Sequence, residues 1–192
     1  MVLLVAGLAL LLVLQLLNHS DSFRTLLVKR YGPWSYRIAM AAAALGALAL
    51  VVHGKANAEY HFVWLPPAWL QLFVLPLMFV AFILLAAALV PSNLRRWTGE
   101  PALWAVVLWA AVHGMIRENL AAITFFAGLG ILALSEIGSR LRRGPSRIGK
   151  KYPLLNESIT VATGGVMFLV AFYLHAAIVG VPPTMMMGRG MF

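Results

Sequence analysis

The stretch AWLQLFVLPLMFVAFILLAAALV, from Ala68 to Val90, decides the fold class of this chain. It contains no charged residue, and Gln71 is its only strongly polar side chain. As a helix, these 23 residues would be about 35 Å long at 1.5 Å per residue. That length crosses the roughly 30 Å hydrocarbon core of a bilayer. The stretch therefore predicts a transmembrane helix, with a kink at Pro76.

Five further apolar runs lie before and after this stretch: Met1–Leu17, Ile38–His53, Pro101–Ile116, Leu120–Glu136 and Ser158–Val181. Spanning segments have to be helical here, because backbone polar groups in lipid must be satisfied within the segment. Of the 192 residues, 62% are hydrophobic and 11% charged, whereas about a quarter are charged in soluble domains. We therefore expect an all-α, polytopic membrane bundle of six transmembrane helices that forms a single domain over residues 1–192.

Basic residues between the runs predict how the bundle is oriented. Twelve of the 15 Lys and Arg residues lie in the first, third and fifth connections, and six of these lie in a basic loop of about residues 138–156. Because cytoplasmic loops carry the excess of Lys and Arg, these connections should face the cytoplasm and both termini should lie outside. The basic residues sit in short gaps between apolar runs, so we expect a lipid bilayer and no nucleic acid as partner.

Polar residues follow one face of the first run. Gln15, Asn18, His19 and Ser22 have the i, i+3, i+4, i+7 spacing of a helical face. A polar stripe pointing into lipid is costly, so this face should look into the bundle or into a wet cavity. Two interpretations stay open. The stripe can be hydrogen-bonded glue between helices, or a fraying helix end; alternatively, His19 contributes to a cofactor or substrate site.

Four other histidines are present, of which His113 and His175 lie late in apolar runs, His53 closes a run and His61 lies in a connection. Ionisable residues inside a membrane are functional candidates, and imidazole is a ligand of haem iron. The alternative for each is a histidine hydrogen-bonded to a neighbouring carbonyl group. With no Cys in the chain, an axial haem pair would be His/His or His/Met, the latter from Met185–Met187.

Other motifs favour structural roles. Glu100, Glu118, Glu136 and Glu157 lie near the ends of the runs, where solvated or capping roles are expected. Ala42 and Gly46 have the small-xxx-small spacing of closely packed helices. The absence of Cys excludes disulfides, thiolate metal sites and cysteine nucleophiles. No motif assigns a catalytic residue.

Several short motifs, in their order along nearly the whole chain, resemble the NnrU family. They are Asn18-His19-Ser20 with Arg24, Tyr31-Gly32-Pro33 with Tyr36-Arg37, the stretch from Trp64 to Leu70, the stretch from Leu108 to Gly114 before Asn119-Leu120-Ala121, and Leu174-His175 with Gly180-Val181. The resemblance implies a multi-pass protein of the bacterial inner membrane that is associated with nitrite and nitric-oxide reduction in denitrification. The family is also similar to zeta-carotene isomerase, a membrane enzyme that uses b-type haem to isomerise a polyene.

The resemblance also implies which histidines would hold a metal. The motifs around His19 and His113 resemble those of the haem-binding histidines in the isomerase, so these two are the candidate axial ligands of a haem b. One departure is Gly99-Glu100-Pro101, where relatives often carry Arg-His-Pro. By depth, however, His19 should lie near the cytoplasmic end of its helix and His113 in the outer half of the membrane. His175 matches the depth of His113, so it is the cofactor-binding alternative to His19.

Three functions are compatible with these observations. The first is a haem protein of nitrogen-oxide respiration that exchanges electrons with a redox partner. The second is a haem-dependent cis–trans isomerase of a lipid-soluble polyene such as zeta-carotene. The third is a non-enzymatic membrane protein of assembly or regulation, in which the histidines only hydrogen-bond between helices.

Overall fold

The computed structural model describes residues 1–144 and 151–180. Part of the basic loop and the Met185–Met187 segment therefore lie outside the described residues. Within them the chain forms eight helices: α1 (Val2–His19), α2 (Asp21–Tyr31), α3 (Pro33–Ala56), α4 (Ala68–Leu89), α5 (Asn93–Thr98), α6 (Pro101–Met115), α7 (Leu120–Arg142) and α8 (Leu154–Val179). The only β-type pairing in this part of the chain is an isolated bridge between Phe62 and Asn119. The predicted all-α fold is confirmed.

Five of these helices, α1, α3, α4, α7 and α8, are long and apolar enough to span a membrane. The sixth expected span corresponds to α6, a helix of 15 residues that begins at Pro101 as predicted. Its length of about 22 Å is less than the thickness of a hydrocarbon core. Pro76 lies inside α4, and the kink expected there stays a prediction.

Two helices, α2 and α5, divide connections that the sequence analysis treated as loops. Each follows a serine that lies just after an apolar run and caps the new helix. The Ser20 hydroxyl accepts a hydrogen bond from the Phe23 backbone N–H, and the Ser92 hydroxyl accepts one from Arg95. Because Ser20 is extended, α1 ends at His19. Ser22 therefore belongs to α2 and is not part of the polar face of α1, which corrects the predicted stripe.

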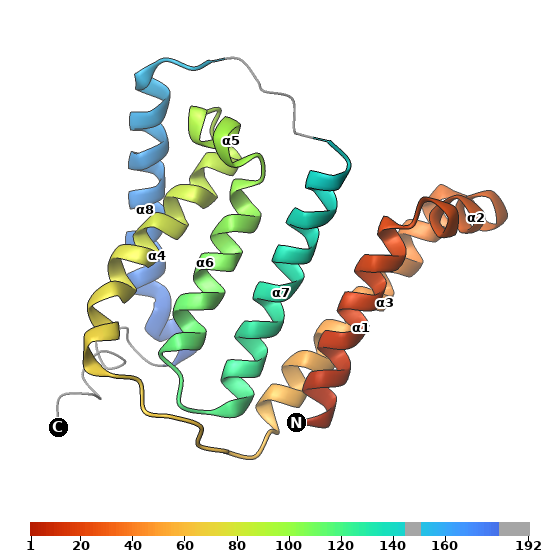
Figure 1. The fold of residues 1–192 in the computed structure, drawn as a ribbon, viewed down its shortest axis with the longest axis horizontal. Helices are drawn as coiled ribbons and strands as arrows, with labels where there is room; N and C mark the ends of the chain where they lie inside the picture. The colour runs from red at the N-terminus through yellow and green to blue at the C-terminus, as the bar shows by residue number, and fades with distance from the viewer. Residues whose placement is uncertain (145–150, 181–192) are drawn as a thin grey trace.

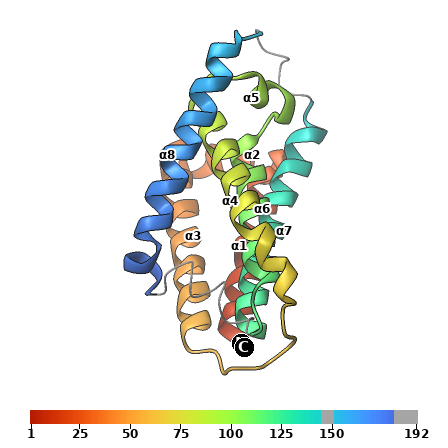
Figure 2. The ribbon, with the colours of Figure 1, turned by 90° about the vertical axis from the view of Figure 1, so that its left-hand side faces the viewer.

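The long helices form a row rather than a closed bundle. Figure 1 shows α8, α4, α6 and α7 side by side, followed by the paired helices α1 and α3. After a 90° turn, Figure 2 shows the same helices running along one common direction. Helices α2 and α5 lie at the upper ends of the long helices in Figure 1, and the α3–α4 and α6–α7 connections lie at the lower ends. The first and third connections therefore lie at the same end of the helices. Which side of the membrane this end faces stays a prediction.

Small residues allow α1 and α3 to pack closely. A Cβ atom on Gly7 would lie 2.8 Å from the Val51 backbone nitrogen, and one on Gly54 would overlap the Leu4 backbone. The predicted Ala42–Gly46 spacing is not the packing surface, because a Cβ on Gly46 would meet no heavy atom within 4 Å. The helix uses a different face, on which Val51 is fully buried. Van der Waals packing of this kind is the main force between helices in lipid.

This packing predicts opposite effects for two glycines of α3. Gly54→Ala should lower the free energy of unfolding by about 1–3 kcal/mol, because the new methyl group has to displace the α1 backbone. Gly46→Ala should leave it unchanged or raise it by up to about 1 kcal/mol, because alanine favours the helix. Unfolding in mild detergent, followed by circular dichroism, measures both. Equal losses in the two variants would contradict the described packing.

Candidate functional site

The described residues hold two candidate sites, which lie near opposite ends of the long helices. The first is an apolar cavity of about 200 Å³ between α4, α6 and α8, which we name the histidine cavity. His113 of α6 and His175 of α8 both line it. Gln71 is the one other side chain of the lining with an amide or charged group. Two imidazoles from different helices thus meet in a largely apolar space.

His113 is held in a defined orientation. It lies in the last turn of α6, and its Nδ1 atom is 2.9 Å from the Trp109 carbonyl oxygen. A carbonyl group can only accept, so Nδ1 carries the proton and Nε2 keeps its lone pair. The ring also packs against Trp109 and Phe126, with centroid distances of 5.1 and 5.2 Å. A histidine that donates one ring N–H to a carbonyl is prepared to bind a metal through the other nitrogen.

His175 reaches the cavity because α8 packs on α4. Phe168 of α8 contacts Phe79 and Phe82 of α4 edge to face, with centroid distances of 5.7 and 6.0 Å. Gly164 allows the close approach, since a Cβ there would lie 2.8 Å from the Ile83 Cα atom. These contacts fix the register of the two helices. His175, three turns of helix further on, is then placed opposite α6.

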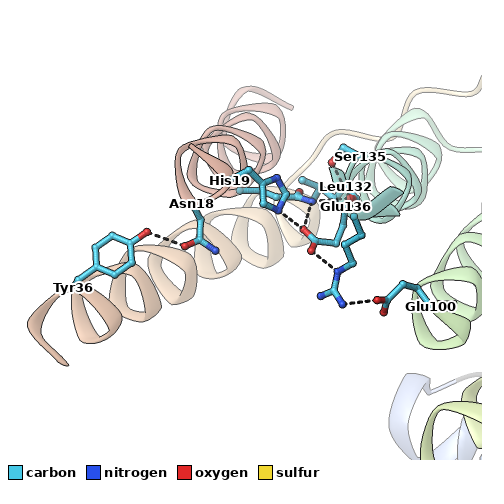
Figure 3. A network of polar contacts seen from close by, with 9 residues as sticks. Asn18, His19, Tyr36, Glu100, Leu132, Ser135 and Glu136 are labelled. Carbon is cyan, nitrogen blue, oxygen red and sulfur yellow. Dashed lines mark hydrogen bonds and ion pairs between the residues drawn. The ribbon is translucent and has the colours of Figure 1, made fainter. Parts of the chain in front are cut away.

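The second candidate site is centred on Glu136 of α7 (Figure 3), and we name it the Glu136 network. One carboxylate oxygen lies 2.7 Å from His19 Nε2 and accepts a hydrogen bond of 3.0 Å from Gln15. The other oxygen accepts a 2.7 Å hydrogen bond from Arg140, whose guanidinium also lies 2.8 Å from Glu100. The network therefore ties the end of α1 to α7 and to the start of α6.

The polar stripe of α1 is thus divided between two neighbours. Gln15 also donates to the Leu132 carbonyl oxygen of α7 at 3.1 Å. Asn18, on the other side, accepts a 2.8 Å hydrogen bond from the Tyr36 hydroxyl of α3. Both contacts join helices, which agrees with the interpretation of the stripe as interhelical glue.

Glu136 departs from the solvated or capping role expected of the glutamates. Its side chain is only 18% exposed and binds three side chains. Glu157 does match the expectation, because it accepts a hydrogen bond from the Asn93 backbone N–H at the start of α5. The sequence did contain a signal for the network: Glu136 and Arg140 have the i, i+4 spacing of a helical ion pair.

The structure brings His113 together with His175 and leaves His19 elsewhere. His113 packs on Phe126 of α7, whereas His19 binds Glu136, ten residues further along the same helix. That spacing corresponds to about 15 Å along the helix axis. Two imidazoles on one iron must approach to about 4 Å, given metal–nitrogen bonds of about 2 Å. The His19–His113 pair implied by the resemblance therefore does not meet in this arrangement.

The remaining histidines lie outside both sites. The His53 carbonyl and ring are contacted by the Asn57 amide at the end of α3. His61 lies 3.5 Å from Glu59 in the exposed α3–α4 connection. Among residues 1–144 and 151–180, no three His, Cys, Asp or Glu residues are grouped as a metal site.

The Glu136 network predicts a structural role that can be measured. Glu136→Gln should lower the free energy of unfolding by about 1–3 kcal/mol, because His19, Gln15 and Arg140 lose a charged acceptor. Glu59→Gln is the matched control, since that side chain is 89% exposed and should change stability by less than about 0.5 kcal/mol. Thermal unfolding in detergent compares the two. Equal stability of both variants would mean that the network does not hold α1 against α7.

The chain was compared with known proteins in three ways. The search of curated proteins and the search of solved structures found no match. A family model described as NnrU protein matches residues 3–183, nearly the whole chain and all of the helices named above. The chain therefore belongs to the NnrU family.

Proposed function

We propose that this NnrU-family protein binds one b-type haem in the histidine cavity, where His113 and His175 would hold it, and takes part in nitrogen-oxide respiration in the bacterial inner membrane. The observation that carries the proposal is the meeting of two imidazoles from α6 and α8 in one apolar cavity. The link to nitrite and nitric-oxide reduction comes from the family resemblance alone.

The donor chemistry of the cavity suits haem. Neutral imidazole is the commonest protein ligand of haem iron, and the Trp109 carbonyl holds His113 in the metal-binding tautomer. Aromatic side chains of the lining, among them Trp109, Phe82, Phe168 and Phe172, can pack against a flat macrocycle. The chemistry of the two histidines and of the aromatic lining therefore suits a haem.

The size of the cavity sets a condition on this proposal. Its volume of about 200 Å³ is below the roughly 300–1,000 Å³ of ordinary ligand pockets. A haem therefore requires α8 to lie further from α6 than it does here. Helix α8 packs chiefly on α4 and lies at the edge of the row, so this movement breaks few contacts.

Haem bound in this cavity would supply one-electron redox chemistry. The chain's own residues have separate tasks. His113 and His175 would bind the haem and set its orientation. The hydrogen bond from His113 to the Trp109 carbonyl raises the basicity of the His113 imidazole. The lining would surround a bound group with aromatic and aliphatic side chains, which influence its redox potential. His19, held by Glu136, positions α1 and is not needed as a ligand.

A second function, haem-dependent cis–trans isomerisation of a polyene, is favoured by the same lining. Most of the side chains around the cavity are apolar, and three of them are phenylalanines. Such walls accommodate a conjugated hydrocarbon chain beside a bound macrocycle. The assembly or regulatory function is the outcome that remains if no group binds to the histidines.

We also propose that α6 crosses the membrane with the five longer helices, with both termini outside. Helix α6 lies between α4 and α7 and packs on both, so its two ends are placed near theirs (Figure 1). Residues that flank the helix complete the span. Because the chain has no Cys, single cysteines introduced into the α3–α4 and α7–α8 connections would show directly which side of the membrane each connection faces.

The haem proposal predicts which histidines are required. After expression with ample haem and purification in mild detergent, the wild-type chain should show a Soret band and a reduced-minus-oxidised b-type spectrum. His113→Ala and His175→Ala should each lose most of the haem, because each removes an axial ligand. His19→Ala should keep the spectrum, and His53→Ala is the matched control outside the cavity.

Two results would contradict the proposal. A wild-type chain without a Soret band would exclude the cofactor and favour the non-enzymatic function. A spectrum that depends on His19 and His113 but not on His175 would support the pairing implied by the resemblance instead. Circular dichroism of each variant distinguishes loss of haem from loss of fold.

A further inference from the structure

Two adjoining pockets occupy the corner where α1, α2 and α3 meet. The first, of about 630 Å³, is lined by charged and polar side chains of α2 and α3, and we name it the basic pocket. The second, of about 480 Å³, is a groove between α1, α3 and α7, and we name it the apolar groove. The two share three lining residues, which are Asn18, Tyr36 and Arg37. The two pockets therefore adjoin at these three side chains, and we name them together the recess.

The basic pocket has an excess of positive charge. Arg24, Lys29 and Arg37 line it together with one carboxylate, that of Asp21. None of the ion pairs described for residues 1–144 and 151–180 involves these three cations. Arg24 and Lys29 of α2 line the pocket, and the Arg37 guanidinium lies 5.4 Å from the centre of the Trp34 ring. The pocket is thus suited to an anionic group.

The apolar groove continues from the basic pocket along the spanning helices. Leu11, Leu14, Met40, Ala41 and Leu132 form most of its lining. From Asn18 to Leu11 it follows α1 for about 10 Å. One recess therefore changes from cationic to apolar along the axis of the helices.

The position of α2 places this change at the membrane surface. Helix α2 begins two residues after the last residue of α1 and lies across the end of the α1–α3 pair (Figure 1). Three apolar and aromatic side chains of α2 and the start of α3 are largely exposed: Leu26 (63%), Tyr31 (57%) and Trp34 (71%). Exposed aromatic and apolar side chains at the end of a spanning helix are typical of the interfacial layer. The basic pocket is therefore at the depth of lipid headgroups, and the groove is at the depth of acyl chains.

We propose that this recess binds one anionic phospholipid, with its phosphate on Arg24, Lys29 and Arg37 and an acyl chain in the apolar groove. Basic pockets between membrane helices bind anionic headgroups, and each Lys or Arg near the surface adds to the attraction. The hydrogen bond from Tyr36 to Asn18 holds the wall that the two pockets share. Because Leu132 of α7 also lines the groove, the lipid joins the α1–α3 pair to α7.

The test measures lipid retention by native mass spectrometry of the purified full chain. Phosphatidylglycerol should bind more tightly than phosphatidylcholine, which has no net charge. Arg24→Gln combined with Lys29→Gln should weaken phosphatidylglycerol binding by roughly 25-fold, about fivefold for each cation. The matched control is Arg142→Gln combined with Arg143→Gln, which removes the same charge from the exposed end of α7 and should change binding less than about twofold.

A third variant and a competitor test the groove. Ala41→Phe should reduce phosphatidylglycerol binding while the three cations remain, because the new ring fills the groove. Glycerol 3-phosphate, which has the phosphate but no acyl chain, should not compete.

Three results would overturn the proposal. Equal losses in the two charge variants would indicate general attraction of the basic surface, and unaltered binding by Ala41→Phe would exclude the groove. Effective competition by glycerol 3-phosphate would indicate a site for a free phosphate ester. Unchanged circular dichroism spectra show that the variants are folded.

Discussion

The rest of this structure depends on one constraint: inside a bilayer, each polar group needs a partner within the protein. The constraint makes the long apolar runs helical, since a helix satisfies its own backbone. It also acts on the side chains of α1, because Gln15 and His19 bind α7 while Asn18 binds α3. Polar contacts of this kind fix how far each helix can slide along its neighbour. They place the α1–α3 pair against α7 at one end of the row.

Where polar contacts are few, packing by small residues takes over. Gly7 and Gly54 let α1 and α3 approach each other, and Gly164 does the same for α8 on α4. The two pairs differ in what surrounds them. The α1–α3 pair is also tied to α7 through Glu136, whereas α8 packs chiefly on α4 alone. Among the helices that form the row, α8, which carries His175, therefore packs on the fewest neighbours, and the histidine cavity lies beside it.

Much of the fold follows from the sequence because hydrophobicity dominates it. The starts of α4, α6 and α7 at Ala68, Pro101 and Leu120 coincide with the starts of apolar runs. The short helices α2 and α5 were missed, since their start signals are single serines, Ser20 and Ser92, inside polar connections. Small residues of α3 were predicted to pack against another helix, but the contact face predicted from Ala42 and Gly46 was wrong. Spacing alone does not say which side of a nearly uniformly apolar helix meets a partner.

The candidate site was predictable only in part. Helical rise placed His113 and His175 at a similar depth, and the structure puts both on one cavity. The resemblance instead favoured His19, whose ring binds Glu136. The difference could not be resolved from one sequence, because depth gives a position along the membrane normal and not which helices are neighbours. Likewise, Glu136 was expected near solvent, since the sequence does not reveal that α1 brings two side chains, Gln15 and His19, to it beside Arg140.

The central claim is that the side chains at positions 113 and 175 face each other across one cavity. Because the chain has no Cys, paired cysteines test this directly. The measurement is cross-linking of the double variant His113→Cys, His175→Cys by a short bifunctional thiol reagent in membranes, compared with His19→Cys, His113→Cys. The account predicts an intramolecular cross-link for the first pair and none for the second. A cross-link between positions 19 and 113, with none between 113 and 175, would contradict it.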